Sequence, residues 1–384
     1  MHSVSVKLPS SQGTTMTGTI DFPDSPPVAY AMFAHCFTGS RFTPAAARVC
    51  KTLAEYGIAS LRFDFPGLGQ SEGNFEDTCF SSNVEDIIAA NEWMTRQYSA
   101  PQLLVGHSLG GAASLRAATR IRNLRAVATI GAPFDPAHAV LHFADRIKEV
   151  DDHGAVTVVL GGRDIVISRP FLEDLADTDP EAYLPRMRKP LMIVHSPIDQ
   201  TVGVDNAQNI FRTTRYPKSL VSLDKADHLC TRQGVAQHAG HIIGNWVQQY
   251  LEPEFTPEPT NADTAVARPA AGTRFGAVVR TDDRELVTDR PKAAGGKNQG
   301  FSAMGLLMSA LASATSQAVR EAAKGMPLDD VEVSVVNVLD STFERRIHLV
   351  GDLSVEQRRV LLDAAKKTDI EAMLEGANIM DVQA

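Results

Sequence analysis

The 384-residue sequence predicts an α/β fold followed by a smaller α+β domain. Before residue 252, short apolar runs alternate with amphipathic segments, which indicates parallel strands buried on both faces. Residues 252–271 are rich in Pro, Thr and Ala, which is typical of a linker. After them, strands and helices follow one another with little βαβ alternation, which favours an α+β domain. We therefore expect domains at residues 1–251 and 272–384.

The expected strands of the first domain are short apolar runs, each ended by Gly, Pro, Ser or Asp. They are AYAMFAH, GIASLRFDF, QLLVGHS, RAVATIGAP, PLMIVHS and SLVSLD. Between them lie helix-like segments: PAAARVCKTLAEY, NVEDIIAANEWMTRQY and AQNIFRTTRY. In a sheet of this kind, reactive groups lie at the carboxyl ends of the strands.

The second domain begins with two expected strands in RFGAVVRTDDRELVTDRP, joined at Asp282-Asp283. A long helix rich in small residues follows over 301–325 and ends at Gly325. The segments VEVSVVNVLD and FERRIHLVG alternate as strands, and SVEQRRVLLDAAKK is a helix. Ser354 and Gln357 form a capping box for that helix.

Composition excludes several classes of protein. The chain is 43% hydrophobic and 22% charged, and no run of about eighteen apolar residues predicts a membrane span. A net charge of −9 and a pI near 5.7 argue against binding to nucleic acid or anionic membranes. The start MHSVSVKLPSSQG has no secretory pattern, and the four cysteines show no metal-ligand spacing. We expect a cytoplasmic protein without metal or cofactor.

A single serine follows the strand QLLVGHS. Ser108 lies in G-H-S-L-G between Gly106 and Gly110, and a helix-like segment begins at once. A strained turn of this kind holds a nucleophilic hydroxyl clear of the sheet, with the helix N-terminus behind it. The simpler alternative is a tight strand-to-helix turn without chemistry. His107, inside the turn, is expected to pack and orient.

A nucleophilic serine needs an acid and a histidine later in the chain. Asp199 follows the strand PLMIVHS, and His228 follows the strand SLVSLD. We expect His228 to be the general base and Asp199 to hold its tautomer, with Asp205 as the alternative acid. His195 is expected to be structural, and no histidine pair has metal-ligand spacing.

An oxyanion hole needs two backbone N–H groups. One is expected from Leu109, directly after Ser108, and the other from Phe37 in the loop HCFTGS. Cys36 in the same loop is expected to be a small buried residue, with a thiol near the pocket as the alternative.

Taken together, GHSLGG, HCFTGS, DFPGLGQSEG, HSPIDQTVG and ADHL make residues 1–251 resemble the α/β-hydrolase superfamily. The resemblance implies an eight-stranded, mostly parallel sheet, with Ser108, Asp199 and His228 as the catalytic residues. It also implies a small helical insertion over the pocket, at about residues 134–186.

Residues 272–384 resemble the OsmC-like proteins, through ELVTDRPKAAGGKNQGFSAMGLLMSALASATS, KGMPLDDVEVSV and HLVGDLSVEQRRVLLDAAKKTDIEAMLEG. The whole chain resembles the bifunctional α/β-hydrolase/OsmC fusion family. That likeness implies a homodimer, with binding of an apolar ligand as the alternative, and a terminal strand. The family's two cysteines fall on Ala314 (Ser313 if the register slips) and Thr368. No cysteine follows Cys230, so we expect this domain to be inactive as a thiol peroxidase.

The function that these residues favour is a serine hydrolase acting on an ester, thioester or related small acyl compound through an acyl-enzyme. Two alternatives remain at this stage: an OsmC-type hydroperoxide-detoxifying protein and a non-catalytic binding protein on a hydrolase fold. Esterase activity leads over peptidase, amidase or lactonase activity through superfamily base rates alone.

Overall fold

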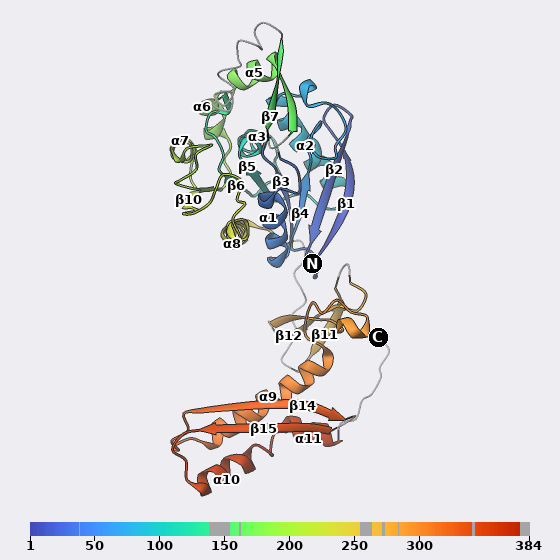
Figure 1. Cartoon of the computed structure of the whole chain (residues 1–384), viewed down its shortest axis with the longest axis vertical. Coiled ribbons are helices and arrows are strands. Elements are labelled where there is room, and N and C mark those ends of the chain that lie inside the picture. The colour runs from blue at the N-terminus through green and yellow to red at the C-terminus, as the bar shows by residue number, and fades with distance from the viewer. Residues whose placement is uncertain are drawn as a thin grey trace. The chain divides into compact units, whose positions relative to one another are not determined.

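The protein divides into two compact units, Met1–Pro259 and Thr260–Ala384 (Figure 1). Each unit is described by itself. The computed structural model describes residues 1–37, 39–137, 154–160, 163–253, 263–270, 273–282, 284–339 and 342–376.

An eight-stranded sheet forms the centre of the first unit (Figure 1). Its order is β1-β2-β4-β3-β5-β6-β9-β10, and every neighbouring pair from β4 to β10 is parallel. Only the hairpin of β1 and β2, which pairs with β4, is antiparallel. The α/β prediction is therefore confirmed. The strands are β1 His2–Pro9, β2 Thr15–Phe22, β3 Ala29–Ala34, β4 Ile58–Phe63, β5 Leu103–His107, β6 Ala126–Ile130, β9 Leu191–His195 and β10 Lys218–Ser222.

Helices cover both faces of this sheet. One face packs against α1 (Pro44–Glu55) and α8 (Val235–Val247). The other packs against α2 (Phe80–Gln97) and α3 (Leu109–Ala118). Alternate residues of β3 and β5 point to opposite faces of the sheet, and helices cover both faces. These strands are therefore buried on both faces, which explains their continuous apolar sequences. The helix α7 (Val204–Thr213) lies between β9 and β10 in the chain.

The segment expected to be a small helical insertion, 134–186, contains strands as well. Its β7 (Ala155–Leu160) and β8 (Arg163–Ser168) pair antiparallel, and α5 (Arg169–Ala176) and α6 (Pro180–Tyr183) follow. The expectation of a small helical insertion is corrected to a mixed one with helices and a hairpin, because AVTVVL and RDIVIS are rich in β-branched residues on either side of Gly-Gly. Part of the segment, 138–153, lies outside the described residues.

The insertion is attached to α2. The backbone N–H and the hydroxyl of Ser81 each donate a 2.5 Å hydrogen bond to the carboxylate of Asp174 on α5. The Phe171 ring, also on α5, is buried against Phe37 and Phe75 of the body of the unit.

The second unit combines a three-stranded antiparallel sheet with a β-hairpin and helices. Its sheet order is β11-β12-β13, and the hairpin is β14-β15. The expected strands and long helix are present, and Ser354 and Gln357 form the expected capping box. The bounds are β11 Ala265–Pro269, β12 Ala277–Thr281, β13 Arg284–Thr288, α9 Ala303–Ala322, β14 Asp330–Leu339, β15 Thr342–Val350, α10 Val355–Ala364 and α11 Asp369–Gly376.

One boundary of the second unit differs from the prediction. β11 falls inside the expected linker 252–271. This segment forms a strand because its backbone pairs with β12, and its composition gave no indication of that pairing. The expected terminal strand, after residue 376, lies outside the described residues. None of the described helices is long and apolar enough to cross a membrane.

Candidate active site

Ser108 lies at the turn between β5 and α3, with a backbone φ of +53°. A left-handed conformation is costly for a residue with a Cβ, and here the backbone hydrogen bond from Ser108 to Ile130 helps to hold it. Glycine is required on both sides. A Cβ at Gly106 would lie 2.5 Å from the Ser114 hydroxyl, and one at Gly110 would collide with the carbonyl oxygen of His35.

The structure brings together the three residues expected to form the catalytic triad. The Ser108 hydroxyl donates to Nε2 of His228 at 2.9 Å, and Nδ1–H of His228 donates to Oδ2 of Asp199 at 2.8 Å. Ser108 follows β5, Asp199 follows β9 and His228 follows β10, so all three come from the carboxyl edge of the parallel sheet. The geometry is that of a nucleophile, a base and an acid in hydrogen-bonded series.

The carboxylate of Asp199 is fixed by its own loop. Its Oδ1 accepts hydrogen bonds from the backbone N–H groups of Thr201 (2.8 Å) and Val202 (3.0 Å), which leaves Oδ2 for His228. Burial acts to raise the pKa of Asp199, but the hydrogen bonds from His228, Val202 and Thr201 outweigh it and hold the pKa below its usual value. The alternative acid, Asp205, is exposed in the first turn of α7.

Two other histidines support the loops of the site. His107 is buried, and its Nε2–H donates to the backbone carbonyl oxygen of His228 at 2.8 Å. Burial, followed by the neighbouring His228, lowers the pKa of His107 to about 4, so its ring is neutral at neutral pH. His195 is also buried, and its Nε2–H donates to the carbonyl oxygen of Val202 at 2.8 Å.

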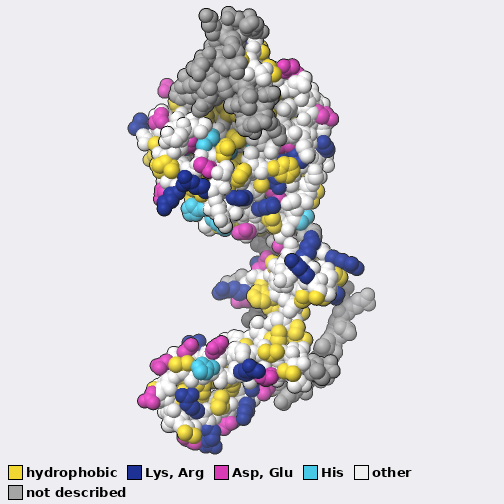
Figure 2. All heavy atoms as spheres, viewed as in Figure 1, with side chains coloured by type: hydrophobic (Ala, Val, Ile, Leu, Met, Phe, Trp, Pro, Cys, Tyr) yellow, Lys and Arg dark blue, Asp and Glu magenta, His cyan; other side chains and the backbone are white. Residues whose placement is uncertain are grey.

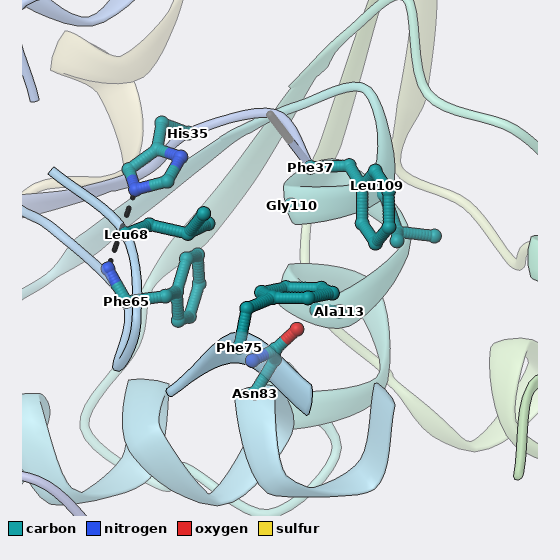
Figure 3. A pocket seen from close by; sticks show the side chains of 9 residues that line it. All are labelled: His35, Phe37, Phe65, Leu68, Phe75, Asn83, Leu109, Gly110 and Ala113. Carbon is teal, nitrogen blue, oxygen red and sulfur yellow. Dashed lines mark hydrogen bonds between the residues drawn. The ribbon is translucent and has the colours of Figure 1, made fainter. Parts of the chain in front are cut away.

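Phe37 and Leu109, the expected oxyanion-hole residues, line one narrow cavity (Figure 3). Leu109 is the first residue of α3, where a backbone N–H has no acceptor within the helix. Phe37 belongs to the loop after β3, the parallel neighbour of β5. The cavity has a volume of about 250 Å³ including its open mouth. It is lined by His35, Phe37, Phe65, Leu68, Phe75, Asn83, Leu109, Gly110 and Ala113.

A buried ion pair fixes the loop that carries Phe37. The carboxylate of Asp64 accepts from the backbone N–H of Arg41 at 2.6 Å and pairs with its guanidinium. The guanidinium also donates to Gln70 at 2.6 Å, and a second buried arginine, Arg62, donates to the carbonyl oxygen of Arg41 at 2.6 Å. Each of the two ions is almost fully buried, so Arg41 is tied to Asp64 at this point of the loop.

None of the four cysteines, each of which lies in the described part of the chain, forms a disulfide bond. Cys36 and Cys230 are buried. Burial raises the pKa of Cys230 to about 12, which makes it a poor thiolate nucleophile. Among the described residues, no group of three or more His, Cys, Asp or Glu side chains is arranged to hold a metal ion.

In the second unit, the two positions that the sequence predicts to match the OsmC cysteines lie on α9 and next to α11, and these two helices contact each other. Ala314 is on α9, and Thr368 precedes α11, where its hydroxyl accepts a 3.1 Å hydrogen bond from the N–H of Glu371. The neighbouring Thr315 accepts from Arg345, which also pairs with Glu371 at 2.8 Å. Thr368 therefore serves as a helix cap.

Sequence reasoning missed three contributors to the site. The role of Arg41 gave no local signal in the sequence, because Asp64, the residue that it binds, is 23 residues further along the chain. Gly131 lies beside Asp199 and His228 and has a φ of +55°. Its position at the end of a strand was the one sign in the sequence that it could belong to the site. Asn83 lies in the cavity, and its Nδ2 has no hydrogen-bond partner. An unpaired buried amide costs about 1–3 kcal/mol.

Comparison with known proteins supports a hydrolase. The family model described as serine aminopeptidase, S33, matches residues 43–160. The human protein named palmitoyl-protein thioesterase ABHD10, mitochondrial, is 32% identical over 136 residues, which is 32% of this chain and 42% of that protein. The match therefore spans less than half the length of this curated relative.

Solved structures match about two thirds of this chain. The esterase domain of a Rhodothermus marinus protein is 40% identical, with a TM-score of 0.54, and the match covers 66% of this chain and 100% of that one. Est1E from Butyrivibrio proteoclasticus, with ferulic acid bound, is 19% identical with a TM-score of 0.55. Its match covers 64% of this chain and 98% of that one, and shows a shared fold.

A mostly parallel eight-stranded sheet with a serine at the turn after a central strand defines the class of protein: an α/β-hydrolase. With the match to the Rhodothermus marinus domain along its full length, the chain belongs to the esterase-type α/β-hydrolases.

Proposed function

We propose that this protein cleaves an ester, a thioester or a related acyl compound through an acyl-enzyme formed on Ser108. The observation that carries the proposal is the continuous hydrogen-bonded series from Ser108 through His228 to Asp199, at 2.9 and 2.8 Å. The order along the chain, Ser, Asp, His, is the one this fold uses.

In the proposed mechanism, Nε2 of His228 takes the proton of the Ser108 hydroxyl as its oxygen attacks the acyl carbon. The N–H groups of Phe37 and Leu109 stabilise the oxyanion of the tetrahedral intermediate. His228 then gives its proton to the leaving alcohol or thiol. A water molecule, deprotonated by His228, releases the acyl group and restores Ser108. Asp199 stays ionised and stabilises the imidazolium at each step, which its lowered pKa favours.

The substrate class rests on the relatives. The curated relatives are named as palmitoyl-protein thioesterases and the Rhodothermus marinus match as an esterase domain, which supports an ester or thioester over a peptide. The proposed chemistry needs no metal or cofactor. We propose a cytoplasmic location, which the reduced state of the four cysteines in the described residues supports.

A fluorophosphonate probe tests the nucleophile. We expect the full chain to be labelled at one site and Ser108→Ala to lose both the label and hydrolysis of p-nitrophenyl acetate. Ser222→Ala, which removes an exposed hydroxyl on β10, is the matched control and should keep both. Labelling that survives in Ser108→Ala would refute the proposal.

For the second unit, we propose an OsmC-like dimerisation module without peroxidase activity. A thiol peroxidase needs an attacking and a resolving cysteine, and no cysteine follows Cys230. A dimer is supported by the small core of this unit. Its long helix α9 has twenty residues and buries only Leu311, Thr315 and Val319. Phe301, next to α9, and Met304 on it stay exposed, and hydrophobic side chains are visible over this helix in Figure 2.

Light scattering on the full chain tests the assembly. We expect the mass of a dimer, twice the 41.5 kDa of one chain. A monomer at micromolar concentration would contradict dimerisation. Consumption of an organic hydroperoxide with a thiol donor would contradict the loss of peroxidase activity.

A further inference from the structure

Two large apolar side chains stay exposed directly beside the catalytic triad. Ile198 precedes Asp199 and is 49% exposed, and Leu229 follows His228 and is 44% exposed. Each belongs to a loop at the carboxyl end of a strand, β9 for Ile198 and β10 for Leu229. Single exposed aliphatic residues are ordinary on a protein surface, but these two flank the acid and the base of one site. Their position makes both side chains accessible to a bound substrate.

Leu229 is held in a tight turn. It is the third residue of a four-residue turn that begins at Asp227. The Cys230 N–H closes this turn by donating to the carbonyl oxygen of Asp227 at 3.0 Å. The carboxylate of Asp227 in turn accepts from the backbone N–H of Thr231 at 2.7 Å. Because successive Cα atoms are about 3.8 Å apart, the turn holds Leu229 right beside His228.

The loop that carries Ile198 is joined to this turn. Ile198 is the third residue of a second turn, which is closed by a 3.3 Å hydrogen bond from the Asp199 N–H to the carbonyl oxygen of Ser196. The Ser196 hydroxyl donates to the carbonyl oxygen of Ala226 at 2.8 Å, and the carboxylate of Asp199 accepts from the catalytic base at 2.8 Å. These two hydrogen bonds connect the loops on either side of Ile198, so the two exposed side chains come from adjoining loops.

The leaving group of the substrate begins on this side of the site. In the proposed mechanism, Nε2 of His228 gives its proton to the leaving oxygen or sulfur, so that atom lies about 3 Å from Nε2 as its bond to the acyl carbon breaks. The carbonyl oxygen of the same substrate is bound elsewhere, by the N–H groups of Phe37 and Leu109. The remaining atoms of the alcohol or thiol therefore start beside His228, where Ile198 and Leu229 offer them apolar surface.

We propose that Ile198 and Leu229 form the contact surface for the leaving group, and that they favour esters and thioesters of apolar alcohols and thiols over those of small or charged ones. The inference rests on the proposed function and names the leaving-group class of its substrate. An alkyl or aryl group that lies against these side chains removes apolar area of both partners from water. Complete burial of one methylene group is worth about fourfold in an equilibrium constant, and contact on one side gives roughly twofold.

Acetate esters of 4-alkylphenols test this preference. The 4-methylphenyl and 4-butylphenyl esters release phenols of nearly equal acidity and leave the same acetyl group on Ser108, so they differ in the apolar length of the leaving group. The readout is the ratio of kcat/KM for the butyl ester to that for the methyl ester, since kcat/KM covers the steps up to release of the phenol. This ratio also cancels the folded fraction of each preparation.

In the wild-type protein we expect the butyl ester to lead by about 5- to 10-fold, from its additional methylene groups at roughly twofold each. Ile198→Thr and Leu229→Asn keep the approximate size of each side chain and make it polar. Each should lower the ratio about twofold, and the double variant should bring it to within about twofold of one. Leu220→Asn is the matched control. Leu220 is 40% exposed in the middle of β10, away from the carboxyl end of that strand, so the ratio should stay at the wild-type value.

The acyl side of the substrate supplies a second control. Phenyl butyrate and phenyl acetate differ in the acyl chain and share the leaving group, so the ratio of their kcat/KM values should be the same in the wild type and the double variant. A butyl-to-methyl ratio near one in the wild type would overturn the inference. So would a ratio that the double variant leaves unchanged, or an equal fall in the acyl ratio; with hydrolysis still dependent on Ser108, each of these results leaves the proposed function standing. Hydrolysis that continues in Ser108→Ala would instead overturn the proposed function itself.

Discussion

Replacing Asp199 with asparagine exchanges one oxygen for an NH₂ group at the position that faces His228. The loop decides which way the amide turns. The two backbone N–H groups of Thr201 and Val202 already point at Oδ1, so the amide oxygen must stay there and the NH₂ group must face His228. A donor now meets Nδ1 of His228, which forces the ring proton onto Nε2. Nε2 can then no longer accept the proton of Ser108.

The size of the loss follows from these contacts. Turning the amide over to rescue the tautomer breaks two backbone hydrogen bonds of about 1 kcal/mol each and sets donors against donors. The imidazolium also loses its charge-assisted hydrogen bond, which is worth about 1.5–3 kcal/mol. Together these amount to about 3.5–5 kcal/mol, or roughly a 10³-fold fall in kcat, since about 1.4 kcal/mol is tenfold in rate.

Steady-state hydrolysis of a p-nitrophenyl ester measures the effect, with circular dichroism confirming that the variant is folded. Asp205→Asn is the matched control, because Asp205 is the nearby alternative acid and lies exposed on α7. A folded Asp199→Asn protein that keeps kcat within about threefold of wild type would refute the reasoning, as would a 10³-fold loss in Asp205→Asn.

Three further changes probe the scaffold of the site. Gly110→Ala pushes a Cβ into a backbone carbonyl of the loop after β3, and should lower the free energy of unfolding by about 1–3 kcal/mol; an unchanged urea midpoint would contradict this. Arg41→Met leaves Asp64 buried without its partner and should cost about 3–5 kcal/mol by the same measurement, whereas Arg120→Met breaks an exposed pair and should cost under about 1 kcal/mol. Because the pKa of His107 is lowered to about 4 when folded, the unfolded chain binds the extra proton between pH 6.5 and 4, and stability should fall over that window by up to about 3 kcal/mol. His107→Gln should flatten that pH dependence in thermal melts, and an identical slope in the variant would exclude His107 as its source.

The sequence predicted the elements that carry the triad because their signals are local. A buried parallel strand appears in the sequence as an apolar run. The turn at Ser108, with its positive φ, brings α3 so close to the neighbouring backbone that positions 106 and 110 must be glycine. Once the sheet was predicted as parallel, the strand ends placed Ser108, Asp199 and His228 at one edge without any knowledge of contacts. Their hydrogen bonds and distances could be read only from the structure.

Other features carried a weak or misleading local signal. The insertion after β6 was expected to be helical, yet its β7 and β8 form a hairpin, and the expected linker contains β11, which becomes a strand by pairing with β12. A strand's hydrogen bonds depend on a partner that composition does not reveal.

What the sequence by itself determined is the α/β sheet, the sharp turn at Ser108 and the order of the acid and base after it, because each depends on backbone conformation and on periodicity along the chain. The tertiary structure alone decided that Arg41, in the loop after β3, forms a buried ion pair with Asp64, and that an asparagine in the first turn of α2 lines a cavity with residues of three other segments. Burial and pairing are properties of residues far apart in sequence, and they exist only after the chain has packed.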